Sequence, residues 1–212
     1  MIENENVYLT TARELLMGRH IEDACAHYYK ANELNPKNAE AEFFSDYLGY
    51  LSLVEERDGS SAANAFSAMT KCLEGAVEDI SKAVFEEVPD AEFKGEAFQA
   101  INRLMVISRL VEIYTPITRY LFTNRLSTTR DTIESGVLGL YALGSAIEKV
   151  FGGNLEFMKE AVKAWKEAVA LQCQFYGYKY NGVTPDEYVT KIQKVEPAYT
   201  KPKKAGCVST SK

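Results

Sequence analysis

The chain has 212 residues, of which 46% are hydrophobic and 25% charged, and it carries a net charge of −6. These values are ordinary for a globular protein, and nothing in them indicates a largely disordered chain. The first residues are acidic and polar, unlike a secretory signal, and the most apolar stretch, 136–147, is too short to cross a bilayer. Because the four cysteines are also scattered, with no CxxC pair, we expect a cytoplasmic protein that does not enter a membrane.

Apolar residues recur with helical periodicity along almost the whole chain, and the alternating pattern of strands is missing. The predicted helices span about residues 4–17, 21–34, 38–56, 62–85, 91–114 and 129–151, followed by a seventh after Asn154 and a short eighth ending near Val195. The sequence therefore predicts an all-α fold of about eight helices.

Proline, glycine and capping residues predict where these helices begin and end. Asn35-Pro36 ends the second helix, because the residue before a proline is pushed out of the helical region. Asn38 is expected to cap the third helix, with Glu40 and Glu42 facing the positive end of its dipole. Thr115-Pro116 is expected to kink or restart the fifth helix.

The last two helices have clear start signals. Asn154, directly after Gly152-Gly153, predicts the cap of the seventh helix. Thr184-Pro185-Asp186-Glu187 predicts a cap, a proline at the first helical position and a glutamate that completes a capping box.

Two helices carry the strongest core signals. The fifth is apolar on more than one side, which predicts a place in the centre of the fold. The apolar stripe of the seventh consists of Met158, Val162, Trp165, Val169 and Tyr176. In the sixth, Gly136, Gly139 and Gly144 match no nucleotide-binding fingerprint, so we expect them to permit close helix packing.

The segment from Ala12 to Asn38 resembles one tetratricopeptide repeat. The residues that carry the resemblance are Ala12, Leu15, Ala24, Tyr28, Ala31 and Pro36, with Tyr8 at the position of the family's first large aromatic. The resemblance implies an antiparallel helical hairpin in which Ala24 and Ala31 permit close approach. The resemblance covers about a fifth of the chain. In the next repeat, Glu42 stands where the family has a large aromatic, Asp46 at the small packing position and Gly49 in place of a bulky residue.

The expected architecture is therefore a set of degenerate helical hairpins that form an α-solenoid or a bundle. Residues 1–58 would form the hairpin plus a third helix, 59–195 a helical domain packed on it, and 196–212 a flexible tail. Residues 188–199, followed by Pro202 and Gly206-Cys207, also look like the last helix and linker of uncharacterised bacterial helical-repeat proteins, which implies architecture and no activity.

In the tetratricopeptide family, the inner face of the first helix binds peptides. The residues that map to this face are Asn6, Leu9, Arg13, Leu16 and Met17. The carboxylate-clamping subgroup has Lys and Asn where Leu9 and Arg13 stand, so that specialisation is not expected here. The alternative is that Leu9 and Leu16 belong to the core.

The charge of the chain is divided unevenly. Residues 1–95 carry 8 basic and 19 acidic side chains, for −11, whereas residues 96–212 carry 16 and 11, for +5. The basic half includes a run of arginines, Arg103, Arg109, Arg119, Arg125 and Arg130, in which Glu112 is the sole acid before residue 131. These arginines suit phosphate or carboxylate groups, with nearby aromatic rings for stacking, but pairing with the acidic half explains them equally well.

Residues with catalytic chemistry are few. His20, Cys25 and His27 lie within eight residues but point to different faces, so no metal site is expected, and no nucleophile or phosphate-loop motif is present. We therefore expect no cofactor and a non-enzymatic scaffold that binds a protein or peptide, with homo-oligomers left open. The residues considered for partner binding are Asn6, Leu9, Arg13, Met17, Arg103, Arg109 and Arg119.

Two alternative functions remain. One is a helical enzyme or small-ligand binder with a site lined by the arginines and the tyrosine-rich run 175–180. The other is nucleic-acid binding through the basic C-terminal half, which the net negative charge disfavours.

Overall fold

The computed structural model describes residues 4–18, 20–38, 40–42, 44–45, 48, 73–85, 87, 91–120, 122 and 130–204. Within these residues every regular element is a helix, which confirms the predicted all-α class. None of the helices in this part of the chain has both the length and the apolar character that crossing a bilayer requires. The loop predicted at 57–61, Arg125 and Cys207 lie outside the described residues.

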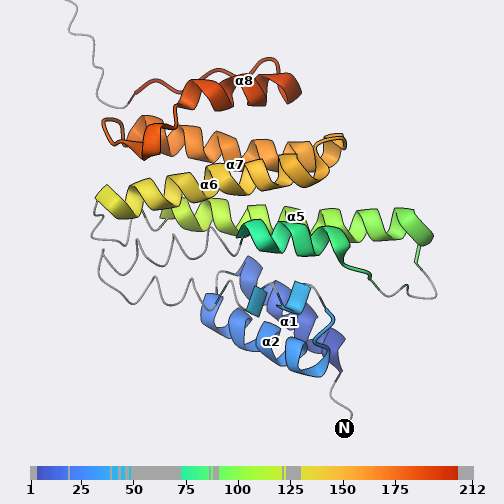
Figure 1. Ribbon diagram of the computed structural model, residues 1–212. Helices are drawn as coiled ribbons and strands as arrows, with labels where there is room; N and C mark the ends of the chain where they lie inside the picture. Colours follow the sequence, from blue (N-terminus) through green and yellow to red (C-terminus); the bar gives the residue numbers. More distant parts are fainter. Residues whose placement is uncertain are drawn as a thin grey trace, which may run out of the picture.

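The helices form a stack (Figure 1). The first two, α1 (Glu5–Met17) and α2 (Ile21–Leu34), lie at one end, followed by a helix over 73–82 and by α5 (Gly95–Tyr120). Next come α6 (Arg130–Phe151) and α7 (Leu155–Gln174), and a short 3₁₀ turn, η2 (Tyr180–Gly182), leads to α8 (Pro185–Val195). Among the described helices, α7 contacts α5, α6 and α8, and α5 lies between the first hairpin and α7 (Figure 1).

The first two helices pack against each other in opposite directions. Glu5, at the start of α1, accepts hydrogen bonds from the side chains of Asn35 and Asn38, which follow the end of α2. Four side chains at the contact between α1 and α2 are fully buried: Ala12, Ala24, Tyr28 and Ala31. Small residues at this contact let the two helix axes approach, and the ring of Tyr28 stacks on Phe44 behind them.

Several predicted helix ends are confirmed. The second helix spans the predicted residues 21–34, and Asn38 accepts a hydrogen bond from the backbone N–H of Ala41. Asn154 accepts one from the N–H of Glu156 at the start of α7. Thr184 and Pro185 start α8 as predicted, but Thr184 makes no side-chain capping bond, so the capping box does not form.

The expected restart at Thr115-Pro116 does not occur, because α5 continues through both residues to Tyr120. A proline removes one backbone donor from the helix. The hydroxyls of Thr115 and Thr118, on either side of the proline in sequence, donate to the carbonyls of Val111 and Tyr114, each at 2.7 Å.

The fourth and seventh helices are shorter than predicted. In the described residues the fourth helix ends at 82, and 83–85 are not helical. The seventh ends at Gln174, so Tyr176 lies beyond it and is 51% exposed. Tyr176 is therefore not part of the core stripe, whereas Val162, Trp165 and Val169 are fully buried in it.

Two glycines of α6 permit close packing, as predicted. A Cβ atom at Gly144 would lie 2.4 Å from Nε1 of Trp165, and one at Gly136 would lie 2.1 Å from Cζ of Phe122. Both distances are far below van der Waals contact, so these positions accept no larger residue without rearrangement.

The first part of the predicted tail lies against the helices. Lys166 of α7 forms an ion pair of 2.9 Å with Glu196, and its ammonium group also lies over the ring of Tyr199. Gln193 of α8 donates a hydrogen bond to the carbonyl of Tyr199, which packs against the core. Residues 205–212 lie outside the described part of the chain.

Candidate functional site

The residues predicted to bind a partner do not form one surface. On α1, Asn6 is exposed, whereas Leu9 is only 4% exposed and belongs to the core. Arg13 is turned toward a buried carboxylate, and the side chains of Leu16 and Met17 lie outside the described part of the chain. This distribution agrees with the alternative in which Leu9 is a core residue.

The carboxylate that binds Arg13 is Glu40, which is 4% exposed. Arg13 donates two hydrogen bonds to it, from Nε to Oε1 at 2.8 Å and from Nη2 to Oε2 at 2.7 Å. Arg109 of α5 donates from Nη1 to Oε1 at 2.6 Å, and the hydroxyl of Tyr28 donates to the same oxygen at 3.2 Å. We call these four residues the Glu40 cluster.

The charges within the Glu40 cluster compensate one another, as is typical of a cluster that stabilises the fold. Burial alone would raise the pKa of Glu40, but the hydrogen bond from Arg13 and the charge of Arg109 outweigh burial and lower it below its ordinary value of 4.5. Burial, together with the negative charge of Glu40, raises the pKa of Tyr28. The cluster therefore holds a charged carboxylate and a neutral phenol, and it connects the first hairpin to α5.

The other arginines considered for binding also have internal partners. Arg103 donates two hydrogen bonds to the carbonyl of Ala83, at 3.2 and 2.9 Å. Arg119 forms a two-point ion pair with Glu167, with both distances 2.6 Å. Since these groups lie on different parts of α5 and bind different acceptors, they do not converge on a common phosphate or carboxylate ligand.

The residues examined for metal binding are also separated. Nδ1 of His27 lies 2.8 Å from the carbonyl oxygen of Asp23, and Sγ of Cys25 lies 3.5 Å from the carbonyl oxygen of Ser45. Among the described residues, no three His, Cys, Asp or Glu side chains gather in a way that could hold a metal ion.

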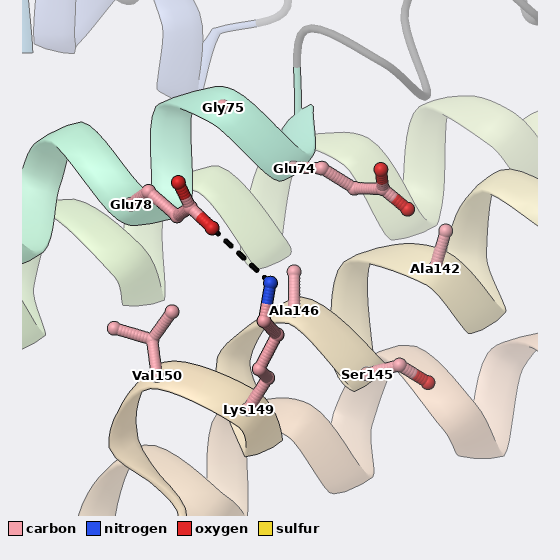
Figure 2. A pocket seen from close by; sticks show the side chains of 8 residues that line it. All are labelled: Glu74, Gly75, Glu78, Ala142, Ser145, Ala146, Lys149 and Val150. Carbon is pink, nitrogen blue, oxygen red and sulfur yellow. Dashed lines mark hydrogen bonds and ion pairs between the residues drawn. The ribbon is translucent and has the colours of Figure 1, made fainter.

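A pocket of about 400 Å³ lies between the helix over 73–82 and α6 (Figure 2). We call it the 73–82/α6 groove. The residues that line it are Glu74, Gly75, Glu78, Ala142, Ser145, Ala146, Lys149 and Val150. It contains none of the arginines or histidines discussed above.

The floor of the groove is made of short side chains, and its rim is charged. Ala142 and Ala146 project from α6 toward the facing helix, which carries Gly75, and Ser145 points to the side (Figure 2). On the rim, Lys149 of α6 reaches across to Glu78, with an Nζ–Oε1 distance of 3.2 Å. These two side chains are 76% and 48% exposed, so water solvates the pair and it contributes little to stability.

Glu74 lies one helical turn before Glu78 on the same face of the helix. Neighbouring carboxylates at this spacing repel each other. The groove therefore has a small, uncharged floor and a rim with two carboxylates and one ammonium group, on which Glu78 pairs with Lys149 and Glu74 points away from both (Figure 2).

No local sequence pattern predicts the groove. The signals for its two walls were present, since 142, 145, 146 and 149 recur at helical spacing and Glu74 and Glu78 are four residues apart. The pairing of these walls depends on a contact between helices about seventy residues apart, which no local pattern specifies.

Comparison with known proteins does not assign the groove: no protein-family model, no curated protein and no solved structure matches the chain.

Proposed function

We propose that this chain is a helical scaffold that binds another protein through the 73–82/α6 groove. The observation that carries the proposal is the form of the groove, which is open to solvent, floored by short side chains and bordered by charged groups. Such a surface admits a polypeptide segment with little rearrangement. Its charged groups lie on an exposed rim, and its one hydroxyl, that of Ser145, has no histidine beside it among the lining residues.

The first hairpin supports this scaffold. We propose that α1 and α2 are a tetratricopeptide-like unit, because its characteristic small residues, Ala24 and Ala31, are fully buried at their contact. The hairpin face that binds peptides in that family is less suitable here. Arg13 is held by Glu40 and Leu9 is buried, so we place the binding surface on the groove.

The partner is a protein rather than a nucleic acid or a small anion. Nucleic acids and phosphates need several basic groups that converge on one surface. Arg13, Arg109 and Arg119 are each paired with a glutamate of the chain, and Arg103 with a backbone carbonyl.

Site-specific photo-crosslinking tests this function. A photo-reactive phenylalanine analogue in place of Ser145 would lie in the groove, and the same analogue in place of Glu187, exposed on α8, serves as the control. In cells of the source organism, we expect a protein adduct from position 145 that position 187 does not give. Identical products from both positions would contradict a binding site in the groove.

The captured protein is then purified and titrated against the unmodified chain. Ala142→Arg would fill the groove without breaking α6, because arginine is a good helix former. We expect this variant to bind about tenfold or more weakly, equivalent to about 1.4 kcal/mol. Unchanged affinity, with a helical circular-dichroism spectrum that shows the variant is folded, would place the binding surface elsewhere.

A further inference from the structure

Gly75 differs from the packed glycines of α6. Glycine is an unfavourable residue inside a helix, and it is retained where packing or a close approach requires it. Gly136 and Gly144 are required by Phe122 and Trp165, which would clash with a Cβ atom. A Cβ atom at Gly75, by contrast, would meet nothing within 4 Å. No contact within the described chain therefore accounts for glycine at this position.

Gly75 is exposed and is one of the residues that line the groove, at the outer edge of the helix over 73–82 (Figure 2). A glycine in a helix lets another backbone approach closely at that point. An approaching backbone from a second protein would use the space that a side chain at position 75 would occupy.

The opposite wall has the matching shape. Ala142, Ser145, Ala146 and Lys149 recur at i, i+3, i+4 and i+7, so three short side chains and one long one follow a single face of α6. Short side chains along one face reduce the distance at which a neighbouring helix packs. The shapes of the two walls are therefore suited to the packing of a helix that lies along α6.

The charges on the rim of the groove favour a bound helix that carries basic side chains. The groove presents Glu74 and Glu78 against Lys149, and the described residues include no ion-pair partner for Glu74. A cationic side chain placed between Glu74 and Glu78 would relieve their mutual repulsion.

We propose that the groove holds an α-helical segment of a partner protein, with its backbone above Gly75 and a lysine or arginine between Glu74 and Glu78. This inference rests on the proposed function and specifies the chemistry of the partner. Lys149 forms only one exposed ion pair with Glu78, so the incoming cation replaces it at little cost.

Two designed amphipathic peptides of about 20 residues test the proposal, one built from alanine, leucine and lysine and the other with glutamate in place of each lysine. Binding to the full chain is measured by isothermal titration calorimetry. We expect the lysine peptide to bind at a one-to-one ratio and the glutamate peptide to give no signal.

Three variants then separate the groove from general charge attraction. The double variant Glu74→Gln, Glu78→Gln removes the rim carboxylates, and we expect it to bind the lysine peptide about tenfold more weakly. Gly75→Leu fills the space above the helix and should weaken binding by a similar factor. Asp79→Asn removes an exposed acid of the same helix that does not line the groove, and it should leave the affinity unchanged within about twofold.

Two results would overturn the proposal. One is equal binding, or none, of the two peptides. The other is a loss of affinity in Asp79→Asn as large as that in the double variant. If either occurs while the protein captured from position 145 still binds and Ala142→Arg still weakens it, the cationic-helix inference fails and the scaffold function stands.

Discussion

The carboxylate of Glu40 and the guanidinium of Arg109 lie 2.6 Å apart, although the two residues are separated by 69 positions in the chain. This ion pair connects the segment after α2 to α5, and it neutralises charge between the acidic and basic halves. Arg13 binds the same carboxylate from α1, so three separate segments meet at one buried anion.

Removing the charge of Glu40 is expected to destabilise the fold. Glu40→Gln keeps the size of the side chain but leaves Arg13 and Arg109 without their anion. Because the two arginines are 38% and 25% exposed, they regain part of their hydration. We therefore expect a loss of about 2 kcal/mol, below the value of about 3–5 kcal/mol for breaking a fully buried pair.

Urea denaturation measures this loss, and Glu42→Gln is the matched control. Glu42 is exposed in the same segment and should change the free energy of unfolding by less than about 0.5 kcal/mol. Equal losses in the two variants would show that the cluster contributes no more than an ordinary surface charge.

The contribution of Glu40 should depend on pH in a defined direction. Its pKa in the folded protein lies below the ordinary value of 4.5, because the hydrogen bond from Arg13 and the charge of Arg109 exceed the effect of burial. A carboxyl with a lowered folded pKa stabilises the fold above its unfolded pKa, and that stabilisation is lost as the pH falls through the folded pKa.

We therefore expect the stability difference between the wild-type chain and Glu40→Gln to be constant from neutral pH to about pH 5.5 and to shrink below about pH 4.5. Urea unfolding at a series of pH values gives this difference directly, and other titrating groups cancel because both proteins contain them. A difference that grows as the pH falls would mean that the pKa of Glu40 is raised rather than lowered.

Alanine substitutions at two helical glycines should have opposite effects. In Gly144→Ala the new Cβ would lie 2.4 Å from Nε1 of Trp165 and 2.9 Å from the carbonyl oxygen of Ala161. Because a backbone atom cannot move away as a flexible side chain can, we expect a loss of about 2–3 kcal/mol. Gly75→Ala meets nothing within 4 Å and should gain up to about 1 kcal/mol from helix propensity.

Thermal or urea unfolding of both variants under one set of conditions checks this pair. A destabilising Gly75→Ala would mean that an internal contact fills the space above position 75. That result would also remove the reason to expect an external backbone there.

Much of the helical pattern could be predicted because local residues specify it. The bounds of α2 follow from Asn35-Pro36, and the start of α7 follows from the cap at Asn154. The all-α class and the close packing at Gly136 and Gly144 also follow from local spacing.

The errors arose where one local signal was outweighed by another or by a distant contact. Thr115-Pro116 was expected to kink or restart the fifth helix, and α5 continues through both residues to Tyr120, so the restart does not occur. Glu40 was expected in the first turn of the third helix, but its burial between two arginines, one of them in α5, was not predicted. The groove was missed for the same reason, since its two walls are brought together only by the fold.

Side chains of α5 form hydrogen bonds with the backbone of the short non-helical segment 83–85. A substitution in α5 tests whether these bonds protect that backbone. Gln99 accepts a hydrogen bond from the N–H of Phe85 and donates one to its carbonyl, both at 2.7 Å, while Arg103 binds the carbonyl of Ala83. In Gln99→Leu the N–H of Phe85 loses this acceptor. We therefore expect its hydrogen-exchange rate to rise about tenfold or more.

Amide exchange measured by NMR distinguishes this local loosening from a loss of global stability. The N–H of Val169, within the buried stripe of α7, should exchange at its wild-type rate, and Arg103→Leu should affect Phe85 less because it leaves Gln99 in place. An unchanged rate at Phe85 in Gln99→Leu would show that the side-chain amide does not protect this backbone. A uniform increase at Phe85 and Val169 would show instead that Gln99 stabilises the whole stack of helices.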